Sequence, residues 1–354
     1  MQEQAGLDIA ALTPASGGES RSAFWITDRA GTVSVLKIMP GAGPQAVSHL
    51  HALDAVLTRL RDRGYPAPRF LAVGHAPGAV FWVQQRLPGA ALDRGQPEPD
   101  RTALARLLPE LLRLNDAQAG LATGTRGWPD LIARTLTAGG DGYCLHATLQ
   151  ARADTRDLLR ALRRIGDRYG PAIPAGDDFV HYDFTLANLL SDGIAITGVI
   201  DINPPVLAGD RAFDLATLLF YLYDQDTIRD LLRARLLDLA GPQAARAYLA
   251  HMVLRQVDWS LRYHPAAAAT RRHLHLARLV TADIDHGPAH LLASRAKPRP
   301  RARHAILDRR QFEDAGPFRA ANAGRGIRDR RSFRRRRRVC RCRRAWRAWR
   351  RTCG

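Results

Sequence analysis

Cysteine is scarce in this sequence, and long apolar segments are missing. Three of the four cysteines lie beyond residue 339, so the preceding chain has only Cys144 and no disulfide framework or cysteine-based zinc site. No apolar stretch approaches the length of a membrane span, and the first residues lack the basic and apolar regions of a secretory signal. We therefore expect a cytoplasmic protein with no membrane partner.

A net charge is also absent from most of the chain. The first 294 residues contain 30 basic and 30 acidic residues, whereas residues 295–354 contain 23 basic and 4 acidic ones and carry the whole net charge of +19. From about Asp285 onward the apolar periodicity fades. Such a composition cannot bury enough apolar surface to offset the entropy lost on ordering. Residues 285–354 are therefore predicted to be a disordered, arginine-rich tail.

Three interpretations of this tail are open. Its arginines, interleaved with Trp346 and Trp349, are typical of an arm that binds nucleic acid, and also of a peptide that lies on a membrane surface. Out-of-frame translation of GC-rich DNA would also yield arginine, alanine, glycine and proline, and we favour this interpretation. Nucleic acid is therefore expected as a partner only through the tail.

The remaining chain has two parts with different patterns. In residues 1–88, runs of β-branched and aromatic residues predict strands around one amphipathic helix. The strands are expected at 22–27, 32–39, 69–74 and 79–85, and the helix at 47–63. In residues 89–284 helical periodicity dominates, at 104–114, 154–169, 213–223, 227–239 and 243–261. The predicted fold class is α+β, with a small N-terminal β-rich lobe and a larger, mainly helical C-terminal lobe.

Three oxygen-bearing side chains stand beside a predicted hairpin. The apolar runs Leu189–Leu190 and Ile194–Ile200 flank an Asp-Gly turn. Because a hairpin returns the chain to its start, Asp201 should lie beside the loop that carries Asp183 and Asn188. Phosphoryl transfer needs a carboxylate that accepts the hydroxyl proton and hard oxygen ligands for magnesium. Each of these residues alone would more often be a cap or turn residue, so the prediction depends on their joint spacing.

The spacing His-x-Asp-x-x-x-x-Asn at 181–188 resembles the aminoglycoside phosphotransferase and choline kinase group, distant relatives of the protein kinases. The segment Gly209–Ala216 is similar to the Gly-Asp-x-x-x-Asp-Leu-Ala segment of that group. The resemblance covers about residues 11–284. It implies a two-lobed, protein-kinase-like fold with ATP between the lobes and the substrate on the helical lobe.

The resemblance also implies a role for each matching residue. Asp183 would be the catalytic base, and Asn188 and Asp201 would be the metal ligands. His181 would organise the loop, although on its own it would more often be a histidine of the core. Two further carboxylates, Asp210 and Asp214, are expected to be structural and to fix the loop after Asp201.

Lys37 is the only lysine before Lys297, and it lies inside the apolar run Val33–Ile38. A charge in such a strand is costly unless it is paired. The resemblance implies that Lys37 reaches the α- and β-phosphates of the nucleotide, where the planar fork of arginine is no substitute. The alternative is a lysine that snorkels at a strand edge.

Two further segments complete the predicted nucleotide site. Ser16–Ser20 resembles the family's short nucleotide loop, in which Gly17, Gly18 and Ser20 would let the backbone approach the phosphates. Gln85 falls in the expected connection between the lobes, where the backbone would hold the adenine. The implied cofactors are ATP, with GTP as an alternative, and Mg²⁺.

The sequence departs from the family at three places. The helix predicted at 47–63 contains no glutamate to pair with Lys37, and Asp54 is the nearest substitute. Tyr182 stands where relatives often have glycine, and Asn203 stands where they often have an acidic residue. These departures indicate a divergent kinase with weaker binding of a second Mg²⁺. They also leave open a pseudokinase that binds nucleotide without turnover.

The reaction implied by the resemblance is transfer of the γ-phosphate of ATP to a hydroxyl of a small molecule. An aminoglycoside-type antibiotic is the leading acceptor class, with antibiotic resistance as the outcome, and choline, sugars, macrolides and amino alcohols are alternatives. A polycationic acceptor calls for a pocket rich in carboxylates, and the candidates are Asp224, Asp226 and Asp258. The alternative from another class is a nucleic-acid-binding protein whose kinase-like part is a scaffold.

Overall fold

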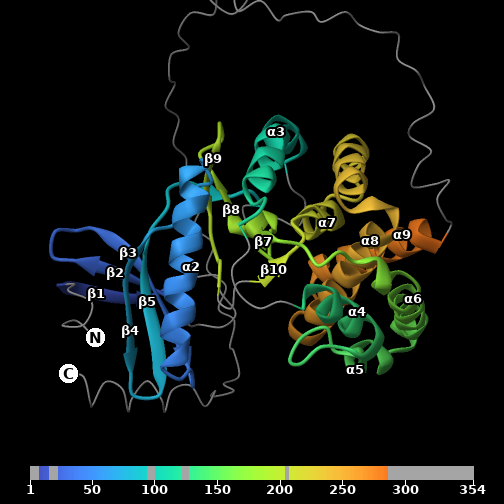
Figure 1. The fold of residues 1–354 in the computed structure, drawn as a ribbon, viewed down its shortest axis with the longest axis horizontal. Coiled ribbons are helices and arrows are strands. Elements are labelled where there is room, and N and C mark those ends of the chain that lie inside the picture. Colours follow the sequence, from blue (N-terminus) through green and yellow to red (C-terminus); the bar gives the residue numbers. More distant parts are fainter. Residues whose placement is uncertain (1–7, 16–22, 94–99, 122–126, 204–206, 286–354) are drawn as a thin grey trace, which may run out of the picture. The chain divides into compact units, whose positions relative to one another are not determined.

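The computed structural model describes residues 8–15, 23–93, 100–121, 127–203 and 207–285, all within one unit, Met1–Arg295 (Figure 1). Within these ranges every helix is too short or too polar to span a lipid bilayer. The tail beyond Asp285 lies outside the described residues, so its disorder and its partners stay predictions. The lobe boundaries at residues 88 and 284 also stay proposals.

The N-terminal part is a five-stranded antiparallel sheet. The strand order is β1-β2-β3-β5-β4, so β3 lies inside the sheet with β2 and β5 as neighbours. The four strands predicted from alternation are confirmed as β2 to β5, and β1 is an addition at the edge. The bounds are Ile9–Pro14 (β1), Ala23–Asp28 (β2), Val33–Pro40 (β3), Phe70–Ala76 (β4) and Ala79–Gln85 (β5).

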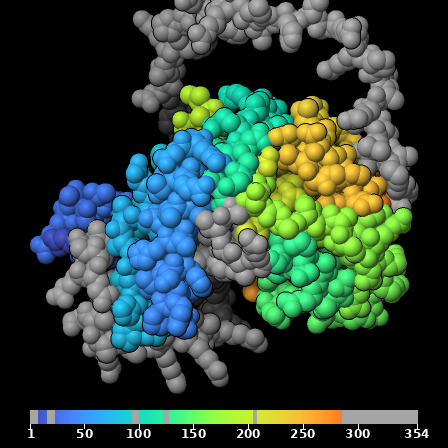
Figure 2. Space-filling model, in the orientation of Figure 1, coloured from blue at the N-terminus to red at the C-terminus, as the bar shows by residue number. Residues whose placement is uncertain are grey.

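Helix α2, Gln45–Asp62, packs its apolar face on this sheet, as the spacing of its apolar residues predicts (Figure 1). Leu50 of α2 forms a buried cluster with Val80 and Trp82 of β5. The opposite face of α2 stays on the molecular surface (Figure 2). The buried residues of α2 recur at helical spacing and are Leu50, Leu53, Val56, Leu57 and Leu60.

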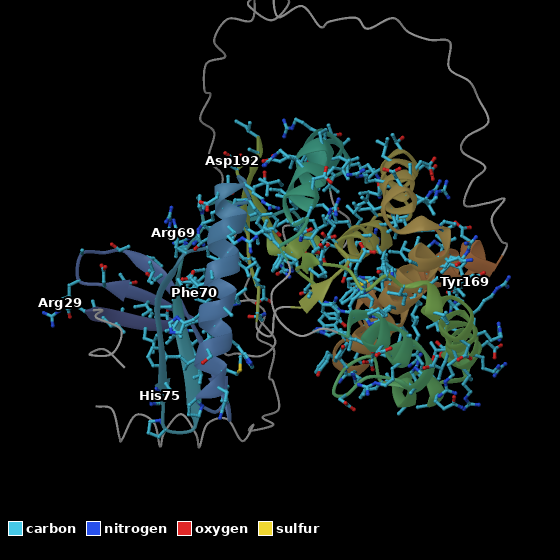
Figure 3. All side chains as sticks on the ribbon, viewed as in Figure 1. Arg29, Arg69, Phe70, His75, Tyr169 and Asp192 are labelled. Atoms are coloured by element: carbon cyan, nitrogen blue, oxygen red, sulfur yellow. The ribbon has the colours of Figure 1, made fainter. Side chains whose placement is uncertain are left out.

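Two small sheets carry the segment that the sequence marks as functional. One has the order β6-β8-β9, and the other pairs β7 with β10. The predicted hairpin is confirmed, because Leu189 of β8 pairs with Val199 of β9. Asp192 lies at the turn, where its side chain accepts hydrogen bonds from the backbone (Figure 3). The bounds are Ala90–Ala91 (β6), Asp178–Val180 (β7), Leu189–Ser191 (β8), Ile196–Val199 (β9) and Leu207–Gly209 (β10).

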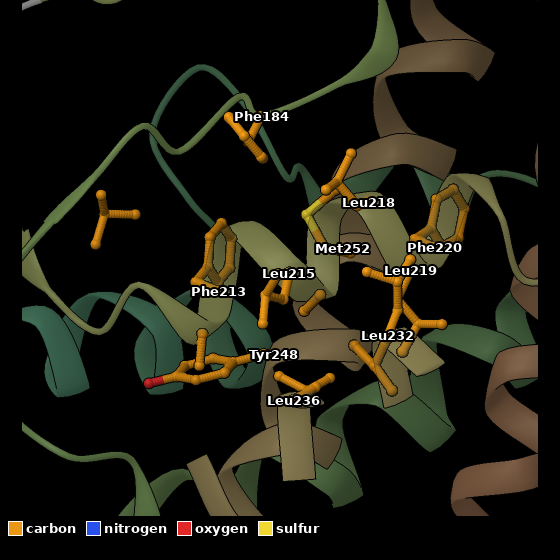
Figure 4. Close-up of a cluster of buried hydrophobic side chains, with 14 of the residues drawn as sticks. Phe184, Phe213, Leu215, Leu218, Leu219, Phe220, Leu232, Leu236, Tyr248 and Met252 are labelled. Carbon is orange, nitrogen blue, oxygen red and sulfur yellow. The ribbon is translucent and has the colours of Figure 1, made fainter. Parts of the chain in front are cut away.

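The rest of the described chain is helical, which confirms the α+β class with a β-sheet lobe and a helical part. Helix α7 lies in the core, where its apolar side chains pack with those of α8 (Figure 4). Helix α8 bends at Gly241, whose φ of 72° is left-handed, and Pro242 follows. The two helices predicted at 227–239 and 243–261 are the two arms of α8. The bounds are Arg101–Ala117 (α3), Trp128–Ala138 (α4), His146–Gln150 (α5), Ala153–Tyr169 (α6), Ala212–Tyr221 (α7), Asp226–Tyr263 (α8) and Ala268–Asp285 (α9).

Candidate active site

Asp214, near the start of α7, holds the loop that carries the predicted base. Its carboxylate accepts hydrogen bonds from the backbone N–H groups of His181 (2.8 Å) and Tyr182 (3.0 Å). Gln118 Nε2 donates a third hydrogen bond, at 2.7 Å. The side chain is fully buried, and burial raises the pKa of the Asp214 carboxyl above its usual value. These contacts support the structural role proposed for Asp214.

Tyr182 stands where relatives often have glycine, and it adopts a backbone conformation that glycine favours. Its φ is +70°, in the left-handed region that glycine favours. The ring of Tyr182 stacks on Phe213 with centroids 5.2 Å apart, and its hydroxyl donates to the hydroxyl of Tyr143 at 3.0 Å. Packing and the hydrogen bond to Asp214 therefore offset the strain in this conformation.

His181 connects the loop to the strand end that carries Asp201. Its Nδ1 accepts a hydrogen bond from the backbone N–H of Asp183 (3.2 Å), and its Nε2 lies 2.9 Å from the carbonyl oxygen of Ile200. Because a carbonyl oxygen can only accept, Nε2 must carry the proton in this contact. The ring is buried, with 6% of its surface exposed. His181 is thus placed to organise the loop, and it is also a buried residue of the core. Both interpretations of this histidine therefore apply.

Asp183 is held on two sides. Asn188 Nδ2 donates to its Oδ2 at 2.8 Å and to its backbone oxygen at 2.9 Å. Arg255 of α8 donates to the other carboxylate oxygen, Oδ1, and to the carbonyl oxygen of Tyr182. The guanidinium carbon of Arg255 lies 4.9 Å from the centroid of the Tyr182 ring. The side chain of Asp183 is still 39% exposed, so an incoming hydroxyl can reach it.

Arg255 was not among the predicted site residues. A signal exists in the sequence, because this charge interrupts the apolar stretch Met252–Val257 of a helix. Burial lowers the pKa of Arg255, but the charge of Asp183 in particular raises it above its usual value, so the guanidinium stays charged.

Lys37 lies in β3 inside the sheet and is 9% exposed, so the alternative of a lysine at a strand edge is wrong. Its Nζ donates to Asp201 Oδ1 at 2.6 Å and to Asn203 Oδ1 at 3.1 Å. Asn203 Nδ2 also donates to Asp201 Oδ1 at 3.0 Å. Burial raises the pKa of Asp201, but Lys37 and these hydrogen bonds lower it below its usual value. Asp201 is therefore ionised at neutral pH.

Asp54 does not substitute for the missing glutamate. In the described part of the chain no ion pair joins Asp54 to Lys37, and the cation nearest to Asp54 is Arg61 of the same helix, at 3.9 Å. Asp54, the nearest substitute in sequence, therefore does not take the place of the glutamate, and the ammonium of Lys37 contacts Asp201 and Asn203.

The predicted metal ligands lie close together. The backbone N–H of Ile200, the residue before Asp201, donates to the carbonyl oxygen of Asn188 at 2.9 Å. Asp201 has a φ of +63°, a further left-handed residue at this site. Among the described residues no group of three or more His, Cys, Asp or Glu side chains is placed to hold a metal ion by itself.

Asp210 anchors the segment that follows β10. It is buried, its Oδ1 accepts from the backbone N–H of Ala212 (2.9 Å), the first residue of α7, and its Oδ2 accepts from the hydroxyl of Tyr248 (2.9 Å). Burial raises the pKa of Asp210. The contacts support its proposed structural role.

The rest of the predicted nucleotide site is described only in part. Gly17, Gly18 and Ser20 lie outside the described residues, so their role stays a prediction. Gln85 ends β5, and its backbone N–H donates to the carbonyl oxygen of Arg69 at 2.8 Å. Its position at the end of the sheet agrees with a connecting segment, and its contact with adenine stays a prediction.

A sheet that presents a buried lysine to an Asp–Asn–Asp cluster on a helical part is the arrangement of the kinase-like phosphotransferases. The sequence pattern of the phosphotransferase enzyme family (APH) matches residues 11–251, and the chain belongs to this family. It is therefore a small-molecule phosphotransferase. A comparison with curated proteins finds no matching sequence.

Several solved structures are similar to this chain. A thermostable mutant of the aminoglycoside phosphotransferase APH(4)-Ia, solved with AMP-PNP and hygromycin B, is 21% identical over 77% of this chain and 94% of its own, with a TM-score of 0.56. The aminoglycoside phosphotransferase APH(3'')-Id of Streptomyces rimosus, solved with ADP and streptomycin, is 19% identical over 70% and 93%, with a TM-score of 0.48. A protein of Thermobifida fusca assigned as a fructosamine-3-kinase is 18% identical over 79% and 96%, with a TM-score of 0.49. At such identities the first of these structures shows the fold alone.

Proposed function

We propose that the protein transfers the γ-phosphate of ATP to a hydroxyl group of a small molecule, with Asp183 as the general base. The observation that carries the proposal is that Lys37, 164 positions before Asp201 in the sequence, hydrogen-bonds to it at 2.6 Å, next to the loop in which Asn188 hydrogen-bonds to Asp183 at 2.8 Å. Phosphoryl transfer is mostly positioning and charge neutralisation, and these groups offer a proton acceptor, metal ligands and a cation for phosphate. The similar APH(4)-Ia structure holds an ATP analogue, which supports ATP as the donor.

Asn188 and Asp201 would hold the Mg²⁺ that accompanies ATP. The Nδ2 of Asn188 already donates to Asp183, which leaves its Oδ1 as the atom that can ligate. Carboxylate and amide oxygens are ligands that Mg²⁺ accepts, usually one or two from the protein with phosphate and water oxygens besides. When bound, the ion would neutralise phosphate charge. Lys37 would then exchange its contact with Asp201 for one with the phosphates.

Asp183 would accept the proton of the acceptor hydroxyl as that oxygen attacks the γ-phosphorus. Asn188 and Arg255 orient its two carboxylate oxygens, and Asp214 fixes the backbone on which it stands. The carboxylate is thus held before the acceptor arrives, which reduces the entropy lost in reaching the transition state.

Aminoglycoside-type antibiotics are the acceptor class to assay first. The similar APH(4)-Ia structure was solved with the aminoglycoside hygromycin B, and phosphorylation of such a compound would confer antibiotic resistance. Fructosamines, sugars and polyols complete the panel. The nucleic-acid-binding alternative depends on the tail, and it would appear as tight, strongly salt-dependent binding to nucleic acid.

The test is Mg²⁺-dependent ATP consumption by the full-length chain in the presence of each acceptor. Asp183→Asn is expected to lower acceptor-stimulated turnover by about 10² or more, because it removes the proton acceptor and keeps the shape. The matched control is Asp157→Asn, which makes the same change in an exposed ion pair with Arg160 on α6.

The outcomes of this assay test the role of Asp183 and distinguish an active phosphotransferase from a pseudokinase. Turnover that is unchanged in Asp183→Asn would refute the role of this carboxylate. Binding of ATP without turnover on any acceptor would favour the pseudokinase that the missing glutamate suggests, and it would overturn the proposed activity.

A further inference from the structure

The two carboxylate oxygens of Asp183 face different groups, the proposed metal ligand on one side and a positive charge on the other. On the first side its Oδ2 is bonded by Asn188, the proposed metal ligand. On the second side its Oδ1 is bonded by Arg255, which comes from α8 in the helical part of the chain. With the proposed metal and nucleotide on the side of Asn188, the side on which the guanidinium lies is left for the acceptor.

The three carboxylates named above as candidates for a cationic acceptor are engaged by arginines of the chain itself. Asp258 is fully buried, and Arg262 binds both of its oxygens at 2.9 and 2.8 Å. Asp224 receives Arg272 at 2.9 and 3.1 Å. Asp226 pairs with Arg229 at 2.9 Å and is 85% exposed at the start of α8.

Tyr221 shows which charges gather around this side of the base. Burial raises the pKa of the Tyr221 hydroxyl, and the charge of Asp183 acts in the same direction, as does Asp93, whereas Arg255 and Arg272 act against it. The hydroxyl donates to Gln256, so it is neutral and occupied. The cluster therefore contains both signs, and the charge in direct contact with the base is positive.

A guanidinium in this place has two effects on an acceptor. An ammonium group that neighbours the reacting hydroxyl has no lone pair with which to accept a hydrogen bond from Arg255, and it would lie beside a cation that is already paired with Asp183. An oxygen in the same position could accept a hydrogen bond, because a guanidinium has five N–H donors and, among the described residues, Arg255 donates to two acceptors, Tyr182 and Asp183.

We infer that the site takes a polyol or hydroxy acid, whose reacting hydroxyl is flanked by oxygen groups, in preference to an acceptor with an ammonium group beside that hydroxyl. Arg255 is the residue that imposes this selection. The inference deepens the proposed function and rests on it. An aminoglycoside would fit only through a ring that presents hydroxyls without a neighbouring amine.

The test compares matched acceptors that differ in one group. Glucose, glucuronate and glucosamine form one set, and myo-inositol and 2-deoxystreptamine form another. For the full-length chain the readout is the ratio of kcat/KM between the oxygen-bearing compound and its amine counterpart. This ratio is measured within one preparation, so partial misfolding of a variant does not alter it.

We expect the wild-type ratio to favour the oxygen-bearing compound by about tenfold or more, after allowance for the partial exposure of the site. Arg255→Gln should bring the ratio close to one, and Arg255→Lys, which keeps the charge, should preserve the direction of the preference. The matched control is Arg235→Gln on the same helix, where the arginine pairs with Asp116 and Asp238. The control should leave the ratio unchanged.

Two results would count against these ideas in different ways. A wild-type preference for the amines, or a ratio that Arg255→Gln does not change, would overturn the inference and leave the phosphotransferase function intact. Failure to phosphorylate any acceptor, antibiotics included, would refute the proposed function and the inference with it.

Discussion

Acidification is expected to destabilise the protein through His251. This residue of α8 is fully buried, and its Nε2 lies 3.4 Å from the hydroxyl oxygen of Tyr182. Its Nδ1 has no hydrogen-bond partner among the described residues. Burial, and then the charge of Arg255, lowers the pKa of His251 to about 3. In the unfolded chain the pKa would be near its usual value of about 6.5.

The direction and size of the effect follow from these two pKa values. Below about pH 6.5 the unfolded chain binds a proton that the folded protein does not bind until about pH 3, so stability is lost as the pH falls through this interval. Between pH 7 and pH 5 the loss from this group is about 2 kcal/mol, or roughly 3–4 °C in Tm for a chain of this size. Burial also lowers the pKa of His273, to about 4, and adds a loss of the same sign.

The measurement is the thermal unfolding of the full-length chain at pH 7, 6 and 5. His251→Gln removes the titrating group and keeps a polar side chain near Tyr182, so the fall in stability with acid should be smaller by about 2 kcal/mol. The matched control is His51→Gln, at an exposed position on α2, which should leave the pH dependence unchanged. If His251→Gln lost stability with acid as steeply as the wild type, the buried, neutral state of His251 would be refuted.

Two further predictions concern the site. Lys37→Arg should weaken ATP binding about tenfold or more, because the side chain of Lys37 is only 9% exposed and a planar guanidinium cannot replace its ammonium beside Asp201. Nucleotide titration measures the affinity, and equal affinity in the variant would contradict this prediction. Asp214→Asn should cost about 2–4 kcal/mol of unfolding free energy, because an amide cannot accept all the hydrogen bonds that this carboxylate accepts. Denaturant unfolding measures the loss, and an unchanged midpoint would exclude the anchoring role of Asp214.

The parts of the fold that depend on local pattern could be predicted from the sequence. Strands β2 to β5, helix α2 and the β8–β9 hairpin have clear periods and turn residues. Strand β1, Ile9–Pro14, was missed because alanines and a proline weaken its strand propensity. Helix α9 was missed although Leu276, Val280 and Ile284 are buried at four-residue intervals, because histidines and arginines lower its apolar content.

The candidate site was predictable where its residues are close in sequence or carry an unusual type. Asp183, Asn188 and Asp201 belong to one segment, and Lys37 is an isolated lysine in a strand. Arg255 was not predictable from spacing, because its contact with Asp183 depends on how α8 packs. For the same reason the sequence could not show that Asp54 makes no ion pair with Lys37.

The buried carboxylate of Asp214 links the loop at His181–Asp183 to helix α7 in the core. Asp214 belongs to the stretch Ala212–Phe220 of α7, whose residues are all buried, and it also holds the amides of His181 and Tyr182. If the loop opened alone, the buried carboxylate of Asp214 would lose two of its three donors, which makes local opening of this loop costly. We therefore expect the motions that admit nucleotide and release product to occur in other segments, while the loop at His181–Asp183 stays fixed.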